Sequence, residues 1–173
     1  MGDAGDDGSA GGYGADGPLY GYATTEVDAS TGYVHHHSAY ADAGGTYSHV
    51  TDAWRGPAFD RSYSATTSYG DGVYRSDVLY AVTPMDGIYA TYGSRDATTY
   101  DLSSHVATRT SVGFSSGYSY TAFHAIDYDT GATVSSYDAR WFSAGGYYEY
   151  TRTSYDGPGG PNASIVGGYH AFG

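Results

Sequence analysis

The chain has 173 residues, enough for one domain, yet only three are leucine and three are isoleucine. Its net charge of -12 argues against nucleic acid as a partner, because neutralising phosphates needs a basic patch and the seven basic residues are scattered arginines. The absence of cysteine excludes disulfide bonds and thiolate chemistry, and no apolar run reaches the length of a transmembrane helix.

Tyrosine takes the place of the missing aliphatic residues, since the chain contains 22 Tyr and 27 Gly. A tyrosine ring can bury a large apolar area while its hydroxyl keeps a protein partner or water. We therefore expect a folded protein with a thin core and many half-exposed rings that contact other subunits. A composition poor in aliphatic residues is also typical of disordered chains, and at this point that alternative stays open.

Residues 1–17 are rich in Gly and Asp and show no periodicity. We expect a flexible N-terminal arm there, followed by a single all-β domain at residues 18–173. Residues 12–17 (GYGADG) match the dinucleotide pattern G-x-G-x-x-G, but no strand precedes them and no helix follows, so no cofactor is predicted. The arm lacks the basic and apolar regions of a secretory signal peptide.

From residue 18 onward, alternating side chains and turn residues predict a series of short strands. Outside the stretch 117–157, we expect strands at 19–27, 33–42, 46–53, 73–83, 105–113 and 163–172, the last of them at an edge. Residues 54–76 are predicted as a crossing loop, with a short edge strand at 62–69. Residues 87–92 are predicted as the second strand of a hairpin, and residues 93–104 as a looser link.

The stretch 117–157 has the clearest strand pattern, because six alternate residues lie on one face of its first strand: Tyr118, Tyr120, Ala122, His124, Ile126 and Tyr128. Turns at 129–131 and 144–146 lead to further strands at 134–142 and 147–154. Residues 19–53 repeat this order of strands and turns. A duplicated three-stranded meander at 19–53 and 117–156 is one interpretation, and chance similarity in a biased sequence is the other.

No segment combines a helical period with caps at both ends. Roughly ten short strands, spaced about eight to twelve residues apart, predict an antiparallel β-sandwich or barrel built from meander hairpins. Residues 113–117 (GFSSG) match the nucleophile-elbow pattern G-x-S-x-G. That pattern needs a strand before it and a helix after it, so we interpret it as a hairpin turn.

The histidine run at 35–37 is the strongest candidate for a metal site. On a strand, His35 and His37 share a face, and imidazoles two residues apart can bind one metal ion. His49, on the next predicted strand, is the candidate third ligand. The alternative is a set of partly exposed histidines that pair with carboxylates and titrate near neutral pH.

Asp127 and Asp129 place carboxylates at alternate positions before a glycine, as calcium loops do. A calcium loop needs more ligands, including a bidentate acid, and no such residue is evident. The alternative is an Asx-type turn, in which the Asp side chain binds the backbone that follows it.

The main functional hypothesis is a non-enzymatic structural subunit of an assembly, such as a virion surface, decoration or fibre component or an extracellular filament subunit. Its partners would be other copies of itself and other assembly proteins, associated through tyrosine-rich sheet faces and edges. No cofactor, nucleic-acid partner or membrane span is expected. The lysine-free, acidic composition suits a high-salt environment, and GC-rich coding would explain it equally well. The candidate contact rings are Tyr118, Tyr120, Tyr137, Trp141, Tyr148 and Tyr150.

Two other hypotheses stay open. One is a carbohydrate-binding β-sandwich module, in which exposed tyrosines or Trp141 stack on glycans. The other is a metal-dependent β-barrel enzyme that uses the cluster at His35–His37. The assembly hypothesis is favoured because the sequence contains no recognisable catalytic set.

Overall fold

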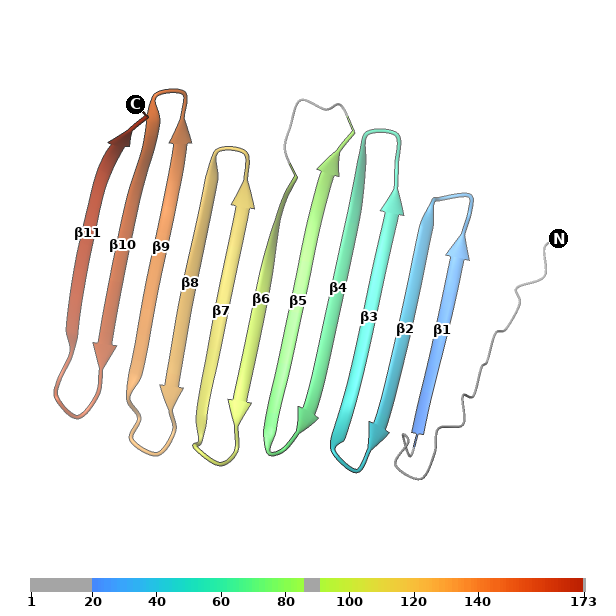
Figure 1. Ribbon diagram of the computed structural model, residues 1–173, viewed down its shortest axis with the longest axis horizontal. Coiled ribbons are helices and arrows are strands. Elements are labelled where there is room, and N and C mark those ends of the chain that lie inside the picture. The colour runs from blue at the N-terminus through green and yellow to red at the C-terminus, as the bar shows by residue number, and fades with distance from the viewer. Residues whose placement is uncertain (1–19, 86–90, 173) are drawn as a thin grey trace.

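The computed structural model describes residues 20–85 and 91–172, which form one antiparallel sheet of 11 strands (Figure 1). The strands lie in chain order across the sheet, so each strand pairs with its neighbours in the sequence. The strands are β1 (Tyr20–Asp28), β2 (Tyr33–Asp42), β3 (Gly45–Arg55), β4 (Phe59–Gly70), β5 (Val73–Pro84), β6 (Tyr92–Asp101), β7 (Val106–Ser115), β8 (Tyr118–Asp127), β9 (Thr133–Ser143), β10 (Gly146–Asp156) and β11 (Asn162–Ala171).

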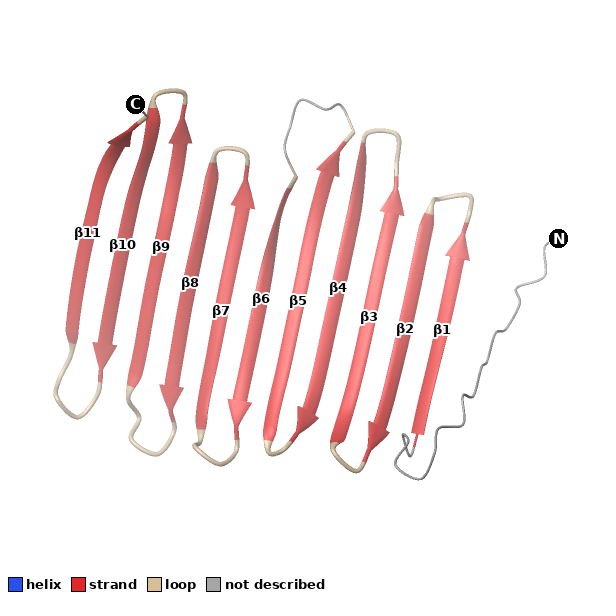
Figure 2. Ribbon diagram, in the orientation of Figure 1, coloured by secondary structure: helices blue, strands red, loops and turns tan. Residues whose placement is uncertain are grey.

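The prediction of an all-β, antiparallel protein built from hairpins is confirmed (Figure 2). The predicted strand at 33–42 coincides with β2, and the predicted edge strand at 163–172 is β11, shifted by one residue. The GFSSG segment at 113–117 forms the end of β7 and the turn into β8, as the hairpin interpretation requires. The described part of the chain contains no helix long and apolar enough to cross a membrane.

The architecture is more open than the expected sandwich or barrel. Residues 20–85 and 91–172 form a single layer that does not close, with β1 and β11 at opposite edges (Figure 1). A barrel would require β1 to pair with β11, and the two strands are not neighbours in the sheet. The described links between strands are short turns, and a short turn places each strand beside the one before it. A sandwich needs at least one longer connection that carries the chain to a second sheet.

Two segments predicted as irregular are strands. The expected crossing loop at 54–76 contains β4, which includes the predicted edge strand at 62–69 but is longer and lies between β3 and β5, not at an edge. The looser link at 93–104 is largely β6, whose Ser, Thr and charged residues occur on both faces, so it lacks the alternation that marks a half-buried strand. In a one-layer sheet neither face has to be apolar. The predicted N-terminal arm and residues 87–90 of the predicted hairpin lie outside the described residues.

The register divides the side chains of the sheet into two faces, because residues paired across strands point the same way. The threonine face carries Thr25, Thr51, Thr66, Thr83, Thr99, Thr108, Thr110, Thr121, Thr151 and Thr153 together with Tyr40, Tyr47, Tyr147 and Tyr155. The opposite tyrosine face carries Tyr22, Tyr33, Trp54, Tyr63, Tyr69, Tyr74, Tyr80, Tyr92, Tyr100, Tyr118, Tyr120, Tyr137, Trp141, Tyr148, Tyr150 and Tyr169.

The core is minimal. Within the described part of the chain, the buried hydrophobic side chains are Val82, 3% exposed, and Ala139, 1% exposed. Both belong to the tyrosine face, and Ala139 lies between Tyr120 and Tyr150 of the neighbouring strands. Burial inside this chain therefore supplies little hydrophobic stabilisation, and the sheet depends mainly on its backbone hydrogen bonds and its aromatic contacts.

Candidate binding surface

The six rings predicted to meet a partner lie together on the tyrosine face. They come from three consecutive strands, β8, β9 and β10, and the register places Tyr118 opposite Trp141 and Trp141 opposite Tyr148. We call this set the aromatic cluster; its members are Tyr118, Tyr120, Tyr137, Trp141, Tyr148 and Tyr150. The period-two pattern predicted that Tyr118 and Tyr120 share a face, and the short turns bring the three strands side by side.

The rings of the aromatic cluster contact one another in a continuous network. Ring centroids lie 5.3 Å apart for Tyr118 and Trp141 and 5.8 Å apart for Trp141 and Tyr148. Tyr137 stacks on Tyr120 at 5.9 Å. These separations fall in the range in which aromatic pairs attract, each contributing roughly 0.5–1.5 kcal/mol beyond the area buried. The rings therefore hold one another in place before any partner arrives.

One phenol pair inside the cluster is hydrogen-bonded. The hydroxyl oxygens of Tyr118 and Tyr137 lie 2.6 Å apart. This hydrogen bond raises the pKa of Tyr137, and burial adds to the effect. The Tyr137 phenol therefore stays protonated well above neutral pH.

Glycines in neighbouring strands let aromatic rings lie flat on the sheet. A Cβ atom on Gly113 would lie 2.1 Å from Cε1 of Tyr120, and one on Gly146 would lie 2.6 Å from the Tyr169 hydroxyl. Each ring thus occupies the space that a side chain would need. The result is a low, broad aromatic surface over the backbone, because the rings cover the glycines instead of standing away from the sheet.

The outer part of the cluster is open to solvent. Trp141 is 42% exposed and Tyr148 is 46% exposed. A shallow depression beside the cluster is lined by Ser135, Ser136, Tyr137, Arg152 and Ser154. The surface therefore combines aromatic faces with hydroxyl groups and one guanidinium group.

A second aromatic group, on β2 and β3, was not identified from the sequence. Tyr33 and Trp54 lie directly opposite each other, with ring centroids 5.2 Å apart. The Tyr33 hydroxyl donates a hydrogen bond of 2.8 Å to Asp52, which raises the pKa of Tyr33. This contact was predictable from the sequence, because a two-residue turn after Asp42 pairs Tyr33 with Trp54.

The candidate metal ligands are divided between the two faces. His35 and His37 share the tyrosine face, as predicted, whereas His49 lies on the threonine face and contacts the Thr66 hydroxyl at 2.8 Å. Nδ1 of His35 lies 2.6 Å from Asp52. Among residues 20–85 and 91–172, no group of three or more His, Cys, Asp or Glu side chains is placed to hold a metal ion.

Asp52 is the polar centre beside these histidines. Burial tends to raise the pKa of Asp52, but hydrogen bonds from His35 and Tyr33 outweigh this effect, so the pKa is lowered overall. The arrangement ties an aromatic ring and an imidazole to one carboxylate. It corresponds to the alternative in which the histidines pair with acidic residues.

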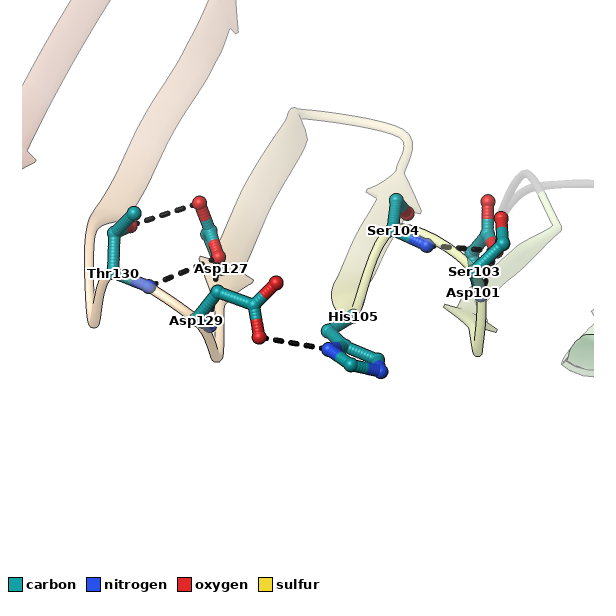
Figure 3. Close-up of polar contacts among 7 residues, drawn as sticks. All are labelled: Asp101, Ser103, Ser104, His105, Asp127, Asp129 and Thr130. Carbon is teal, nitrogen blue, oxygen red and sulfur yellow. Dashed lines mark hydrogen bonds and ion pairs between the residues drawn. The ribbon is translucent and has the colours of Figure 1, made fainter.

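The candidate calcium ligands are engaged in a turn (Figure 3). Oδ1 of Asp127 accepts the backbone N–H groups of Asp129, at 2.8 Å, and Thr130, at 3.2 Å, and the Thr130 hydroxyl donates to Oδ2 at 2.8 Å. The Thr130 hydrogen bond is the main reason that the pKa of Asp127 is lowered. Asp129 turns toward the preceding hairpin, where it lies 2.7 Å from Nδ1 of His105. This is the geometry of an Asx-type turn.

The neighbouring turn repeats this arrangement (Figure 3). Oδ1 of Asp101 accepts the hydroxyl and the backbone N–H of Ser103, at 2.6 Å and 2.7 Å. These hydrogen bonds lower the pKa of Asp101 to about 2. Asp28 and Asp42 likewise accept turn N–H groups at the ends of their hairpins, so part of the Asp excess over Glu serves the turns.

The fold and surface define a single-layer antiparallel meander with one aromatic face and one hydroxyl-rich face. Comparison with protein-family models, curated proteins and solved structures gives no match to the chain.

Proposed function

We propose that the protein is a non-enzymatic structural subunit of an assembly, in which other copies of the chain cover the tyrosine face. The observation that carries this proposal is the exposed aromatic cluster on a sheet that buries only Val82 and Ala139 among its described hydrophobic side chains. A large apolar surface left open on a folded chain is typical of a protein-protein interface.

The size of the face supports this proposal. Eleven strands spaced about 4.8 Å apart, with about ten residues each at roughly 3.3 Å per residue, give a face of roughly 1,700 Å². Two such faces stacked together would bury roughly 3,500 Å² in total. Obligate interfaces typically bury about 2,000–5,000 Å², so one stacked pair falls in that range.

Exposed ion pairs occur on both faces, with Arg95–Asp77 and Arg140–Glu149 on the threonine face and Arg109–Asp96 on the tyrosine face. Charged pairs of this kind are stable in water and costly to bury. The aromatic cluster contains no charged residue, so we propose that it is the part of the tyrosine face that associates with another copy. The setting we propose is a virion or an extracellular filament.

A pair of matched substitutions tests the face. Tyr148→Ser removes an exposed ring from the aromatic cluster, and Tyr40→Ser removes a ring of nearly equal exposure from the threonine face, at 46% and 44% respectively. Sedimentation velocity and light scattering of the full chain should show a large complex for the unsubstituted protein. Tyr148→Ser should raise the protein concentration needed for half-association tenfold or more, and Tyr40→Ser should leave it nearly unchanged.

Two results would contradict the proposal. The first is an unsubstituted protein that stays monomeric at high concentration across a range of salt. The second is an equal loss of assembly in both variants, which would show that the tyrosine face has no special part. Circular dichroism of each variant separates loss of assembly from loss of the sheet.

A carbohydrate-binding module is the second candidate, and one observation favours it. Tyr137 lines a shallow depression together with Arg152 and the hydroxyls of Ser135 and Ser154, and the exposed rings of Trp141 and Tyr148 lie four residues farther along the same two strands. Flat rings flanked by hydrogen-bonding groups suit the apolar faces and hydroxyls of sugars.

Tryptophan fluorescence tests this second candidate. The chain has two tryptophans, so Trp54→Phe leaves Trp141 as the only indole. Titration with soluble polysaccharides should then shift the emission if sugars stack on the cluster, and the shift should disappear with Arg152→Ala. No shift with any polysaccharide would remove the candidate.

A further inference from the structure

We infer that β11 pairs in antiparallel orientation with β11 of a second copy, about a two-fold axis perpendicular to the sheet and centred on Gly167. This inference rests on the proposed function and specifies how two subunits join edge to edge. The observations that carry it are the strand count, the polarity of the two edges and the phase of the β11 backbone.

The number of strands restricts the symmetry. With 11 strands in strict antiparallel order, β1 and β11 run in the same direction at opposite edges (Figure 1). A copy displaced sideways by simple translation would therefore bring its β1 alongside β11 in parallel orientation. A two-fold axis perpendicular to the sheet instead joins β11 to β11 and keeps the antiparallel pattern. It also keeps both tyrosine faces on the same side.

The two edges differ in their protection. β1 contains Glu26 and Asp28, and charged residues on an edge strand discourage pairing. β11 contains no Asp, Glu, Lys, Arg or Pro, and its Ile165 and Val166 are 65% and 68% exposed. For a chain with a net charge of -12, an uncharged edge is also the one where two copies repel each other least. The β11 edge is therefore the open one.

The backbone phase of β11 sets which residues are available. The N–H of Phe172 donates to the carbonyl oxygen of Gly145, on the β10 side. Because the direction alternates along a strand, even-numbered residues of β11 bond to β10 and odd-numbered residues point outward. The outward-pointing residues are Ala163, Ile165, Gly167, Tyr169 and Ala171.

Only certain registers of the β11–β11 pair give every outward-pointing residue a partner. A two-fold axis at Gly167 pairs Gly167 with itself, Ile165 with Tyr169 and Ala163 with Ala171, so every outward-pointing residue finds a partner. An axis at Val166 would leave Ala171 of each copy unpaired. The Gly167 register also brings Ile165 against an aromatic ring on the tyrosine face, a favourable cross-strand pair. It opposes no like charges.

Proline substitutions test the edge. Ile165→Pro removes an outward N–H from β11 without removing a hydrogen bond to β10, since proline is tolerated where an edge N–H faces solvent. Ala23→Pro is the matched control on β1, because the N–H of Arg55 donates to Gly32, which leaves the odd-numbered residues of β1 pointing outward. Ile165→Pro should raise the half-association concentration about tenfold or more, and Ala23→Pro should not.

Single cysteines test the register, because the chain has none of its own. At the two-fold axis, Gly167→Cys would meet its counterpart at a Cα separation of about 5.5 Å, within the range for a disulfide. Ala163→Cys would lie roughly 25 Å from its counterpart. Mild oxidation should give a covalent dimer with Gly167→Cys and little or none with Ala163→Cys.

The outcomes separate this inference from the proposed function. A monomeric unsubstituted protein contradicts both. Assembly that is unchanged by Ile165→Pro, or weakened only by Ala23→Pro, overturns the edge inference and leaves the assembly proposal standing. Equal cross-linking of the two cysteine variants overturns the register. If circular dichroism shows that Ile165→Pro has lost its sheet, the two cysteine variants alone test the edge inference.

Discussion

Replacing Gly113 with alanine should destabilise the sheet, although Gly→Ala in a strand normally helps. The added Cβ would lie 2.1 Å from Cε1 of Tyr120 and 2.8 Å from its Cδ1 and Cζ atoms. The ring must therefore turn aside. Tyr120 contacts Tyr118 and stacks on Tyr137, both at centroid distances of 5.9 Å, and it lies next to the buried Ala139.

The magnitude follows from the contacts that are lost. Two aromatic pairs at roughly 0.5–1.5 kcal/mol each represent roughly 1–3 kcal/mol. The lower conformational entropy of alanine in the unfolded chain returns roughly 0.5–1 kcal/mol. We expect a net destabilisation of about 1–2 kcal/mol. For a chain of this size that corresponds to a fall in Tm of roughly 3–6 °C.

Thermal and urea unfolding, followed by near-ultraviolet circular dichroism of the tyrosines, measure this effect at one fixed protein concentration. Gly117→Ala is the control in the same hairpin, because a Cβ there would have no atom within 4 Å and the residue has no positive φ. It should be neutral or slightly stabilising. A Gly113→Ala protein as stable as the control, with an unchanged tyrosine signal, would refute the placement of the Tyr120 ring over Gly113.

Three further predictions concern charge. The pKa of Asp101 is lowered to about 2, so its contribution to stability is present above its unfolded value of about 3.8 and is lost as the pH falls through 2. Ser103→Ala should raise that pKa, as carboxyl carbon-13 NMR would report. Hydrogen bonding to Asp129 raises the pKa of His105, so its contribution is complete below about 6.5 and is lost as the pH rises through the folded value. In Asp129→Asn, proton NMR should show the His105 pKa falling toward its ordinary value. Raising salt from about 0.05 M to 0.5 M should favour assembly, because it screens repulsion between chains of net charge -12, and light scattering measures this.

The strands that were best predicted from the sequence are those in which rings alternate with small polar residues. β2 and β8 were located to within a residue because their tyrosines or histidines alternate with other residues between clear turns. β6 was missed because its serine, threonine and charged residues occur on both faces, and β4 was predicted only in part, as a short edge strand at 62–69. Alternation reveals a strand only where one face is more apolar than the other, and in a one-layer sheet some strands have no such difference.

The histidine interpretation depended on a single turn residue. A three-residue turn at 43–45 would place His49 on the same face as His35 and His37. The structure pairs Asp42 directly with Gly45, so the turn has two residues and His49 falls on the other face. A shift of one residue in register moves every side chain of the following strand to the opposite side.

The same turn length explains why the aromatic cluster forms. Ser143 pairs with Gly146, so odd-numbered residues of β9 share a face with even-numbered residues of β10. That parity brings Trp141 beside Tyr148. A three-residue turn would have placed Tyr148 on the threonine face, away from Trp141. The sequence supplied the rings of each strand, and the turn length decided whether they meet.

The expectation of a sandwich assumed that a chain with an apolar face must cover that face with its own residues. Leucine and isoleucine would require this, because a wide aliphatic face left in water would drive nonspecific aggregation. Tyrosine does not require it. A phenol offers a hydrophobic ring and a hydroxyl that water can satisfy, so a tyrosine face tolerates water on a free subunit and can still be buried against another. The 22 tyrosines are thus consistent with a one-layer sheet in a way that an aliphatic composition would not be, and in the assembly we propose a neighbouring copy would supply the missing half of the core.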